Sequence, residues 1–136
     1  VDRRQRQMCI RDRYSGDKFS KLSKLDENEI HVSNKTKKED SILITGLPHN
    51  SDFSEKSLHG LIKDMQIYQK VRMIGSAAMA ACYVASGKAE VYKEKGIYLW
   101  DIIAGAAIVE SAGGTAKISN QKDNFQVDVV FSNSKF

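Results

Sequence analysis

Trp100 to Gly114 reads Trp-Asp-Ile-Ile-Ala-Gly-Ala-Ala-Ile-Val-Glu-Ser-Ala-Gly-Gly, and this stretch decides the fold. The residues up to Ser111 favour a helix, and the paired glycines Gly113 and Gly114 are typical of a helix end. Its alanines and glycine form a face of small side chains, which lets a helix approach its neighbour closely. We therefore expect residues 100–111 to form a helix that packs tightly against another element.

The elements around this helix are predicted from the spacing of apolar residues. Gly75 to Ser86 is apolar nearly all round and predicts a helix buried between layers, ended by Gly87. Ser54 to about Gln69 carries a single apolar stripe, which predicts a surface helix with one buried face. Strands are predicted at Ser41–Gly46, Val71–Ile74, Ala89–Tyr92, Thr115–Ile118 and Gln126–Phe131, with weaker edge strands at Phe19–Leu25 and Glu29–Val32. This alternation predicts an α/β domain built in layers.

Length and composition agree with one domain that has a real core. The chain has 136 residues and no apolar run of about 18 residues, so no membrane span is expected. Its two cysteines, Cys9 and Cys82, cannot make a disulfide framework. Cys82 lies in an alanine-rich stretch, where we expect a buried reduced thiol and hence a cytoplasmic protein.

The first thirteen residues differ from the rest in their basic side chains. They hold five arginines and no lysine, whereas the remainder has Arg72 as its only arginine. The string from Arg4 to Arg13 resembles translated sequencing-adapter sequence, so we expect residues 1–13 to be foreign and residues 14–136 to be the native part. The alternative is a natural basic arm that contacts phosphate backbones. It lacks interleaved aromatic residues and a recognition motif, so no nucleic-acid partner is expected.

Candidate chemistry lies at three places, each with an ordinary structural alternative. Asp101 at a helix start is either a helix cap or a ligand for a hard cation such as Mg²⁺. Glu94, between two lysines in an expected loop, is either a solvated charge or an acceptor for polyol hydroxyls. The helix start at Gly75, Ser76 and Ala77 either offers free N–H groups to an oxygen-rich ligand or simply packs closely.

Several other kinds of site are excluded by the sequence pattern. His31, His49 and His59 have no metal-binding spacing, so no zinc site is expected. Neither a phosphate-binding P-loop motif nor a G-x-S-x-G nucleophile elbow is present.

Trp100 to Gly114 is similar to the second signature of the inositol monophosphatase family, W-D-x-x-A-G-x-x-[IL]-[VL]-x-x-A-G-G. Arg72 to Tyr92 resembles that family's R-x-x-G-[ST]-A-A…C-x-V-A-x-G-x-A-[DE]-x-Y at the family's spacing. Shorter resemblances lie at Ile30–Ser33, Leu43–Pro48 and Val130–Asn133. The resemblance implies the C-terminal portion of a layered α-β-α fold with a mixed sheet.

The resemblance also implies functions for the candidate residues. Asp101 matches a catalytic magnesium ligand near the phosphate-bearing hydroxyl, and Glu94 matches a glutamate that binds the inositol ring. Gly75, Ser76 and Ala77 match a segment that contacts substrate. The implied activity is Mg²⁺-dependent hydrolysis of a small phosphorylated polyol or sugar, first of all inositol monophosphate, by a cytoplasmic protein that can be a homodimer. The alternatives are a phosphatase for 3′-phosphoadenosine nucleotides or fructose bisphosphate, and a non-catalytic binding module.

One family signature is missing from these residues. The metal-binding motif D-P-[IL]-D-G-[ST] requires a proline after aspartate, but the chain's only proline, Pro48, follows Leu47. We therefore expect the N-terminal half of the family fold to lie outside these residues. For the same reason, the chain by itself is expected to be inactive. The resemblance also implies a final helix, which we expect beyond Phe136.

Overall fold

The order of strands and helices in a computed structural model matches the predicted alternation from residue 41 onward. The structure describes residues 12–47 and 53–136. Its elements are β1 (Tyr14–Asp17), β2 (Leu22–Leu25), β3 (Asn28–Glu29), the 3-10 helix η1 (Lys38–Asp40), β4 (Ile42–Thr45), α2 (Glu55–Ile67), β5 (Lys70–Met73), α3 (Ala77–Ala85), β6 (Val91–Tyr98), α4 (Leu99–Ser111), β7 (Thr115–Ser119) and β8 (Gln126–Ser132). Except for Asp12 and Arg13, the segment expected to be foreign lies outside the described residues, as do Pro48 and His49.

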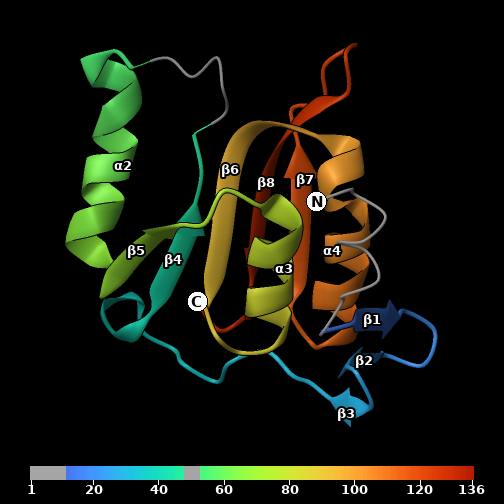
Figure 1. The fold of residues 1–136 in the computed structure, drawn as a ribbon. Helices are drawn as coiled ribbons and strands as arrows, with labels where there is room; N and C mark the ends of the chain where they lie inside the picture. Colours follow the sequence, from blue (N-terminus) through green and yellow to red (C-terminus); the bar gives the residue numbers. More distant parts are fainter. Residues whose placement is uncertain (1–11, 48–52) are drawn as a thin grey trace, which may run out of the picture.

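A five-stranded mixed sheet forms the centre of the domain (Figure 1). Its strand order is β5-β4-β6-β8-β7. β4 runs parallel to β5 and β6, whereas β8 is antiparallel to both β6 and β7. The predicted mixed sheet is therefore confirmed.

Helices lie on both sides of this sheet, as predicted for a layered α-β-α domain: α3 and α4 pack on one face, and α2 lies beside the β5 edge on the other side. α3 and α4 stand side by side in Figure 1, and Gly105 of α4 lies so near α3 that a Cβ there would be 2.5 Å from the Ala81 Cβ. Tyr92 of β6 packs in the core with these two helices. Lys93 points to the other face, since side chains alternate along a strand, and there it pairs with Asp64 of α2 at 2.5 Å. No helix among residues 12–47 and 53–136 is long and apolar enough to cross a membrane.

The predicted burial of one α2 face is confirmed only in part. Ile62 and Met65 of the apolar stripe are 51% and 57% exposed. Leu58, Leu61 and Tyr68 of the same stripe are half-buried, and α2 contacts β5 and, through the Asp64–Lys93 ion pair, β6. An amphipathic stripe shows which face favours burial, but it does not supply the covering element.

Two strand predictions also need correction. β6 continues from Val91 to Tyr98, past the predicted end at Tyr92, because it pairs with β8 through a register shift between Glu94 and Ile97. The weakly predicted edge strands are shorter than expected, at Leu22–Leu25 and Asn28–Glu29, and with the unpredicted β1 they form a separate three-stranded sheet, β1-β2-β3, against α4. Its anchor is the buried Ser23, whose hydroxyl donates to the Ile108 carbonyl at 2.7 Å.

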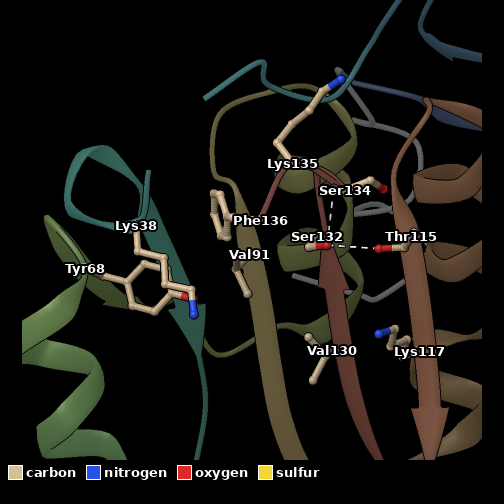
Figure 2. Close-up of a pocket in the computed structure, with 10 residues that line it drawn as sticks. All are labelled: Lys38, Tyr68, Val91, Thr115, Lys117, Val130, Ser132, Ser134, Lys135 and Phe136. Atoms are coloured by element: carbon tan, nitrogen blue, oxygen red, sulfur yellow. Dashed lines mark hydrogen bonds between the residues drawn. The ribbon is translucent and has the colours of Figure 1, made fainter. Parts of the chain in front are cut away.

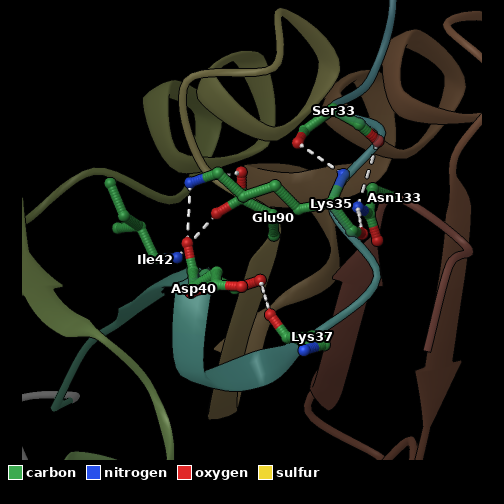
Figure 3. A network of polar contacts seen from close by, with 8 residues as sticks. Ser33, Lys35, Lys37, Asp40, Ile42, Glu90 and Asn133 are labelled. Atoms are coloured by element: carbon green, nitrogen blue, oxygen red, sulfur yellow. Dashed lines mark hydrogen bonds and ion pairs between the residues drawn. The ribbon is translucent and has the colours of Figure 1, made fainter.

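A polar network ties the starts of β4 and β6 to the preceding segment (Figure 3). The Glu90 side chain is 1% exposed, and its Oε2 accepts from the Ile42 backbone N–H at 2.6 Å. Its Oε1 lies 3.5 Å from Lys35 Nζ, which also donates to the Asp40 carbonyl at 2.7 Å. Asn133 Nδ2 donates to the carbonyls of Ser33 and Lys35 at 3.0 and 2.8 Å. The network fixes where β4 begins relative to β6.

Cys82 is buried and free, as predicted, and this sets its expected reactivity. Its side chain is 7% exposed, and burial raises the pKa of the thiol to about 11. Since the thiolate is the reactive form, a Cys9→Ser variant should react with a disulfide reagent at pH 8 about 100-fold more slowly when native than in denaturant. The measurement is absorbance of the released thiol with time. Equal rates in both conditions would contradict the buried position of Cys82.

Candidate active site

The Glu94 carboxylate lies beside the end of β4. Parallel pairing sets Thr45 opposite Lys93, so the next residues, Gly46 and Glu94, are also neighbours. A Cβ on Gly46 would lie 2.5 to 2.7 Å from the three atoms of the Glu94 carboxylate group. The carboxylate therefore occupies the space that any side chain at position 46 would take. The prediction that Glu94 sits in a loop is wrong, because β6 carries it.

Tyr92 holds this carboxylate from the side of the core. Its hydroxyl donates to Glu94 Oε2 at 2.7 Å. Burial, the hydrogen bond to Glu94 and the charges of Glu94 and Asp101 all raise the pKa of Tyr92, so it stays protonated. Burial also raises the pKa of Glu94, the Tyr92 hydrogen bond lowers it, and the charge of Asp101 raises it again. Glu94 and Asp101 therefore share one electrostatic environment.

Asp101 presents an exposed carboxylate at the start of α4. It lies in the first turn of the helix, whose N-cap position is Tyr98, and that cap makes no side-chain hydrogen bond. The Asp101 side chain forms no hydrogen bond with any residue of the described chain. The capping alternative is therefore not supported, although a negative charge in the first turn is favoured by the helix dipole. The carboxylate oxygens remain available for a ligand.

The segment before α3 has a mixed structural role. Ser76 is the N-cap of α3, and its hydroxyl oxygen accepts from the Met79 N–H at 3.3 Å. Gly75 has a φ of 69° and open space around it, whereas Ala77 packs against the core. No hydrogen bond or ion pair in the described residues joins this segment to Glu94 or Asp101.

Sheet topology nevertheless sets these residues at one edge. β4 and β5 are parallel, so Gly46 and Gly75, which follow them, leave the sheet at the same end. β6 is parallel to β4 and passes that end at Glu94 before entering α4. The carboxyl ends of parallel strands are the usual ligand-binding edge of open α/β sheets.

Only one of these residues fits a magnesium ligand by its surroundings. Asp101 has free carboxylate oxygens, which are the donors that Mg²⁺ prefers. Among residues 12–47 and 53–136, no group of three or more His, Cys, Asp or Glu side chains could hold a metal ion. The described residues by themselves therefore do not complete a metal site.

Two hollows elsewhere do not contain the predicted residues. The first hollow, of about 320 Å³, has an apolar lining made by Leu99, Trp100, Ile103 and Phe125. The first three of these residues are close to Asp101 in the sequence. The other, of about 560 Å³, lies on the sheet face opposite α3 and α4 (Figure 2). Lys38, Lys117 and Lys135 line it together with apolar and hydroxyl side chains, and no Asp or Glu side chain lines it.

Tyr92 and Gly46 belong to the site but were not predicted as site residues. A signal for Tyr92 was present, since residues two apart on a strand point to the same face, and Tyr92 and Glu94 have this spacing. Gly46 offered only the general signal of a glycine after a strand, which more often marks a turn.

Comparison with known proteins gives one consistent result. A sequence model described as the inositol monophosphatase family matches residues 9–135. The protein named Nus factor SuhB from Pasteurella multocida is 35% identical over 96 residues, which cover 68% of this chain and 35% of that protein. Phosphatase IMPL1, chloroplastic, from Arabidopsis thaliana is 40% identical over 87 residues, covering 63% of this chain and 24% of that protein.

A solved structure extends the likeness to three dimensions. The inositol monophosphatase from Anabaena (Nostoc) superposes with a TM-score of 0.80 at 25% identity, covering 91% of this chain and 50% of that one. The matches span 35% and 24% of the length of the two curated relatives, so this chain corresponds to a part of them.

Proposed function

Since the chain belongs to the inositol monophosphatase family, we propose that the whole protein containing it hydrolyses a small phosphorylated polyol, first of all inositol monophosphate. The observation that carries the proposal is the pair of carboxylates, Glu94 and Asp101, at the carboxyl edge of the parallel strands. They share one electrostatic environment, yet one is held by a hydrogen bond and the other is free. In such a pair, one carboxylate can bind the polyol and the other can bind the metal.

Each carboxylate has a proposed role that follows from its surroundings. Glu94 keeps Oε1 free of hydrogen bonds within the described chain, so this oxygen can accept one from a substrate hydroxyl. Asp101 would supply a single oxygen ligand to Mg²⁺. When bound, Mg²⁺ in such a site activates water and neutralises charge on the phosphate and the leaving oxygen. Gly75, Ser76 and Ala77 are proposed to contact substrate from the neighbouring strand end.

The other metal ligands are proposed to come from residues outside this chain. One carboxylate cannot assemble a cluster of ions, and the D-P-[IL]-D-G-[ST] signature is not among these 136 residues. We propose that the whole protein carries that signature upstream of Tyr14. A complete reading frame that lacks it would contradict this proposal.

A substrate panel tests the activity directly. The whole protein with Mg²⁺ should release phosphate from inositol 1-phosphate with a higher kcat/KM than from a 3′-phosphoadenosine nucleotide or fructose 1,6-bisphosphate. The resemblance of the Glu94 segment to the inositol branch motivates this order, because the other two substrates also carry hydroxyl groups that a carboxylate oxygen could accept from. Colorimetric phosphate release is the measurement.

The 136-residue chain itself is the matched control for this panel, and it should release no phosphate above background. Phosphate release by that chain would show that it needs no further residues for catalysis. Faster turnover of the adenosine nucleotide by the whole protein would instead indicate a phosphatase of another branch of the superfamily. We further propose a cytoplasmic location and a homodimer. Light scattering on the whole protein would test the dimer.

A further inference from the structure

The Glu94 carboxylate is hydrogen-bonded by one residue outside the predicted site and fills the space beside another. On one side the Tyr92 hydroxyl donates to Oε2 at 2.7 Å. On the other, Gly46 leaves a space in which a Cβ would lie 2.5 Å from Oε2 and 2.7 Å from Oε1. Within the described chain Oε1 has no hydrogen-bond donor. One oxygen is therefore occupied and the other is left for a ligand.

The aromatic ring of Tyr92 is buried in the core, where neighbouring side chains restrict it. Its side chain is 1% exposed, and its ring meets Phe131 edge to face, with centroids 5.8 Å apart and an interplanar angle of 74°. Aromatic pairs favour this arrangement, so the ring has little freedom to turn. A hydroxyl on such a ring gives its acceptor a defined direction.

We infer that Tyr92 and Gly46 are positioning residues, which orient Glu94 so that Oε1 accepts a hydrogen bond from a hydroxyl of the substrate's polyol. This inference rests on the proposed function, because it takes Glu94 as the polyol ligand. An ionised carboxylate oxygen accepts hydrogen bonds but cannot donate them. The site thus selects a hydroxyl donor at this point, and a phosphate without a neighbouring hydroxyl gains nothing from it.

A purely structural role for Tyr92 makes a different prediction. A buried hydroxyl needs a partner, and Glu94 would be that partner whatever the ligand. Loss of the hydroxyl would then change stability, but it would not separate the binding of a polyol from the binding of phosphate. The two roles are therefore distinguished by ligand specificity.

The test compares inositol 1-phosphate with inorganic phosphate, which has no polyol, in the whole protein with Mg²⁺. Tyr92→Phe and Gly46→Ala should each raise the KM for inositol 1-phosphate about 10-fold, with kcat changed less than about 3-fold, by loss of one well-placed charge-assisted hydrogen bond. The inhibition constant of inorganic phosphate should change less than about 2-fold, since phosphate does not use Oε1.

Matched substitutions control for general effects of each change. Tyr83→Phe removes a hydroxyl from α3, and Gly60→Ala adds a methyl group where nothing lies within 4 Å. Both should leave the two constants unchanged. Gly46 has an ordinary φ, so alanine there displaces Glu94 without backbone strain, and it keeps the test valid if Tyr92→Phe fails to fold.

Glu94→Gln separates this inference from the proposed function. If inositol 1-phosphate is not hydrolysed, the proposed function fails and the inference falls with it. If it is hydrolysed but Glu94→Gln leaves its KM unchanged, the inference is overturned while the proposed activity stands. If Glu94→Gln raises that KM but Tyr92→Phe and Gly46→Ala do not, the positioning role alone is overturned. An equal change in both constants would also overturn it, because it would indicate general damage to the site.

Discussion

Asp101→Asn should lower kcat/KM of the whole protein for inositol 1-phosphate about 100- to 1,000-fold at saturating Mg²⁺, because it removes a charged ligand of the proposed metal. The Mg²⁺ concentration for half-maximal activity should rise as well, since asparagine keeps the oxygen but loses the negative charge. Initial rates of phosphate release across a Mg²⁺ titration measure both quantities.

The same substitution should have little effect on folding. Asp101 makes no hydrogen bond within the described chain and lies exposed in the first turn of α4. Only its favourable interaction with the helix dipole is lost, which is worth about 0.3–1 kcal/mol. Asp123→Asn is the matched control, because Asp123 is an exposed aspartate in the turn between β7 and β8.

The split between activity and stability is what decides the role of Asp101. If Asp101 only stabilised the N-terminus of α4, Asp101→Asn would lower the free energy of unfolding slightly and leave kcat/KM unchanged. A loss of less than about 10-fold in kcat/KM, with an unchanged Mg²⁺ requirement, would therefore remove Asp101 from the metal site.

The sequence predicts the order of the elements well, because local physics determines it. α3 and α4 follow from runs of helix-forming apolar residues, and Gly87 ends α3 with a φ of 72°, where glycine is favoured. The buried strand at residues 41–46 follows from its β-branched apolar run, and Leu43 and Ile44 are buried as expected. These predictions need no knowledge of distant residues.

The parts that sequence reasoning misses depend on pairing between distant segments. The lysine neighbours of Glu94 favour a loop, and only the pairing with β8 extends the strand through it. The contact between Gly46 and the Glu94 carboxylate joins residues 48 apart in the chain. Lys93, one of the lysines next to Glu94, forms an ion pair with Asp64 of α2.

The candidate site was predicted unevenly for the same reason. Family resemblance identified Glu94 and Asp101 as candidates, and the structure puts both at the carboxyl edge of the parallel strands. Resemblance said nothing of Tyr92 as a hydrogen-bond donor, because a motif records residue types and not contacts. Ser76 was predicted to contact substrate, and the structure shows that its hydroxyl oxygen caps α3.

Glu90→Ala should destabilise the whole protein by about 2–4 kcal/mol, the largest stability effect we expect in this chain. The substitution removes the acceptor for the Ile42 N–H and the partner of Lys35 Nζ, and it leaves a cavity. Loss of one partner from a buried pair costs about 3–5 kcal/mol, and we lower this range because the Lys35 side chain is 43% exposed. Urea unfolding followed by circular dichroism is the measurement.

Two further variants resolve what the Glu90 side chain contributes. Glu90→Gln keeps the volume and one acceptor oxygen for Ile42, so it should lose only about 1–2 kcal/mol, mainly from the Lys35 interaction. Glu39→Ala is the control, because its side chain is 74% exposed and its ion pair with Lys37 lies on the surface. It should change stability by less than about 0.5 kcal/mol.

Hydrogen exchange should localise the effect of Glu90→Ala at the start of β4. The Ile42 amide donates to the Glu90 side chain, so its protection should fall more than that of Ile44, further along the same strand. The Glu90 backbone keeps its own bonds, since its N–H donates to the Ile42 carbonyl at 3.1 Å and its carbonyl accepts from the Asn133 N–H at 3.0 Å. Equal loss of protection at Ile42 and Ile44 would show that the strand opens as a whole. The Glu90 side chain would then stabilise the sheet without fixing the point where β4 begins, and the register that brings Gly46 to Glu94 would need another cause.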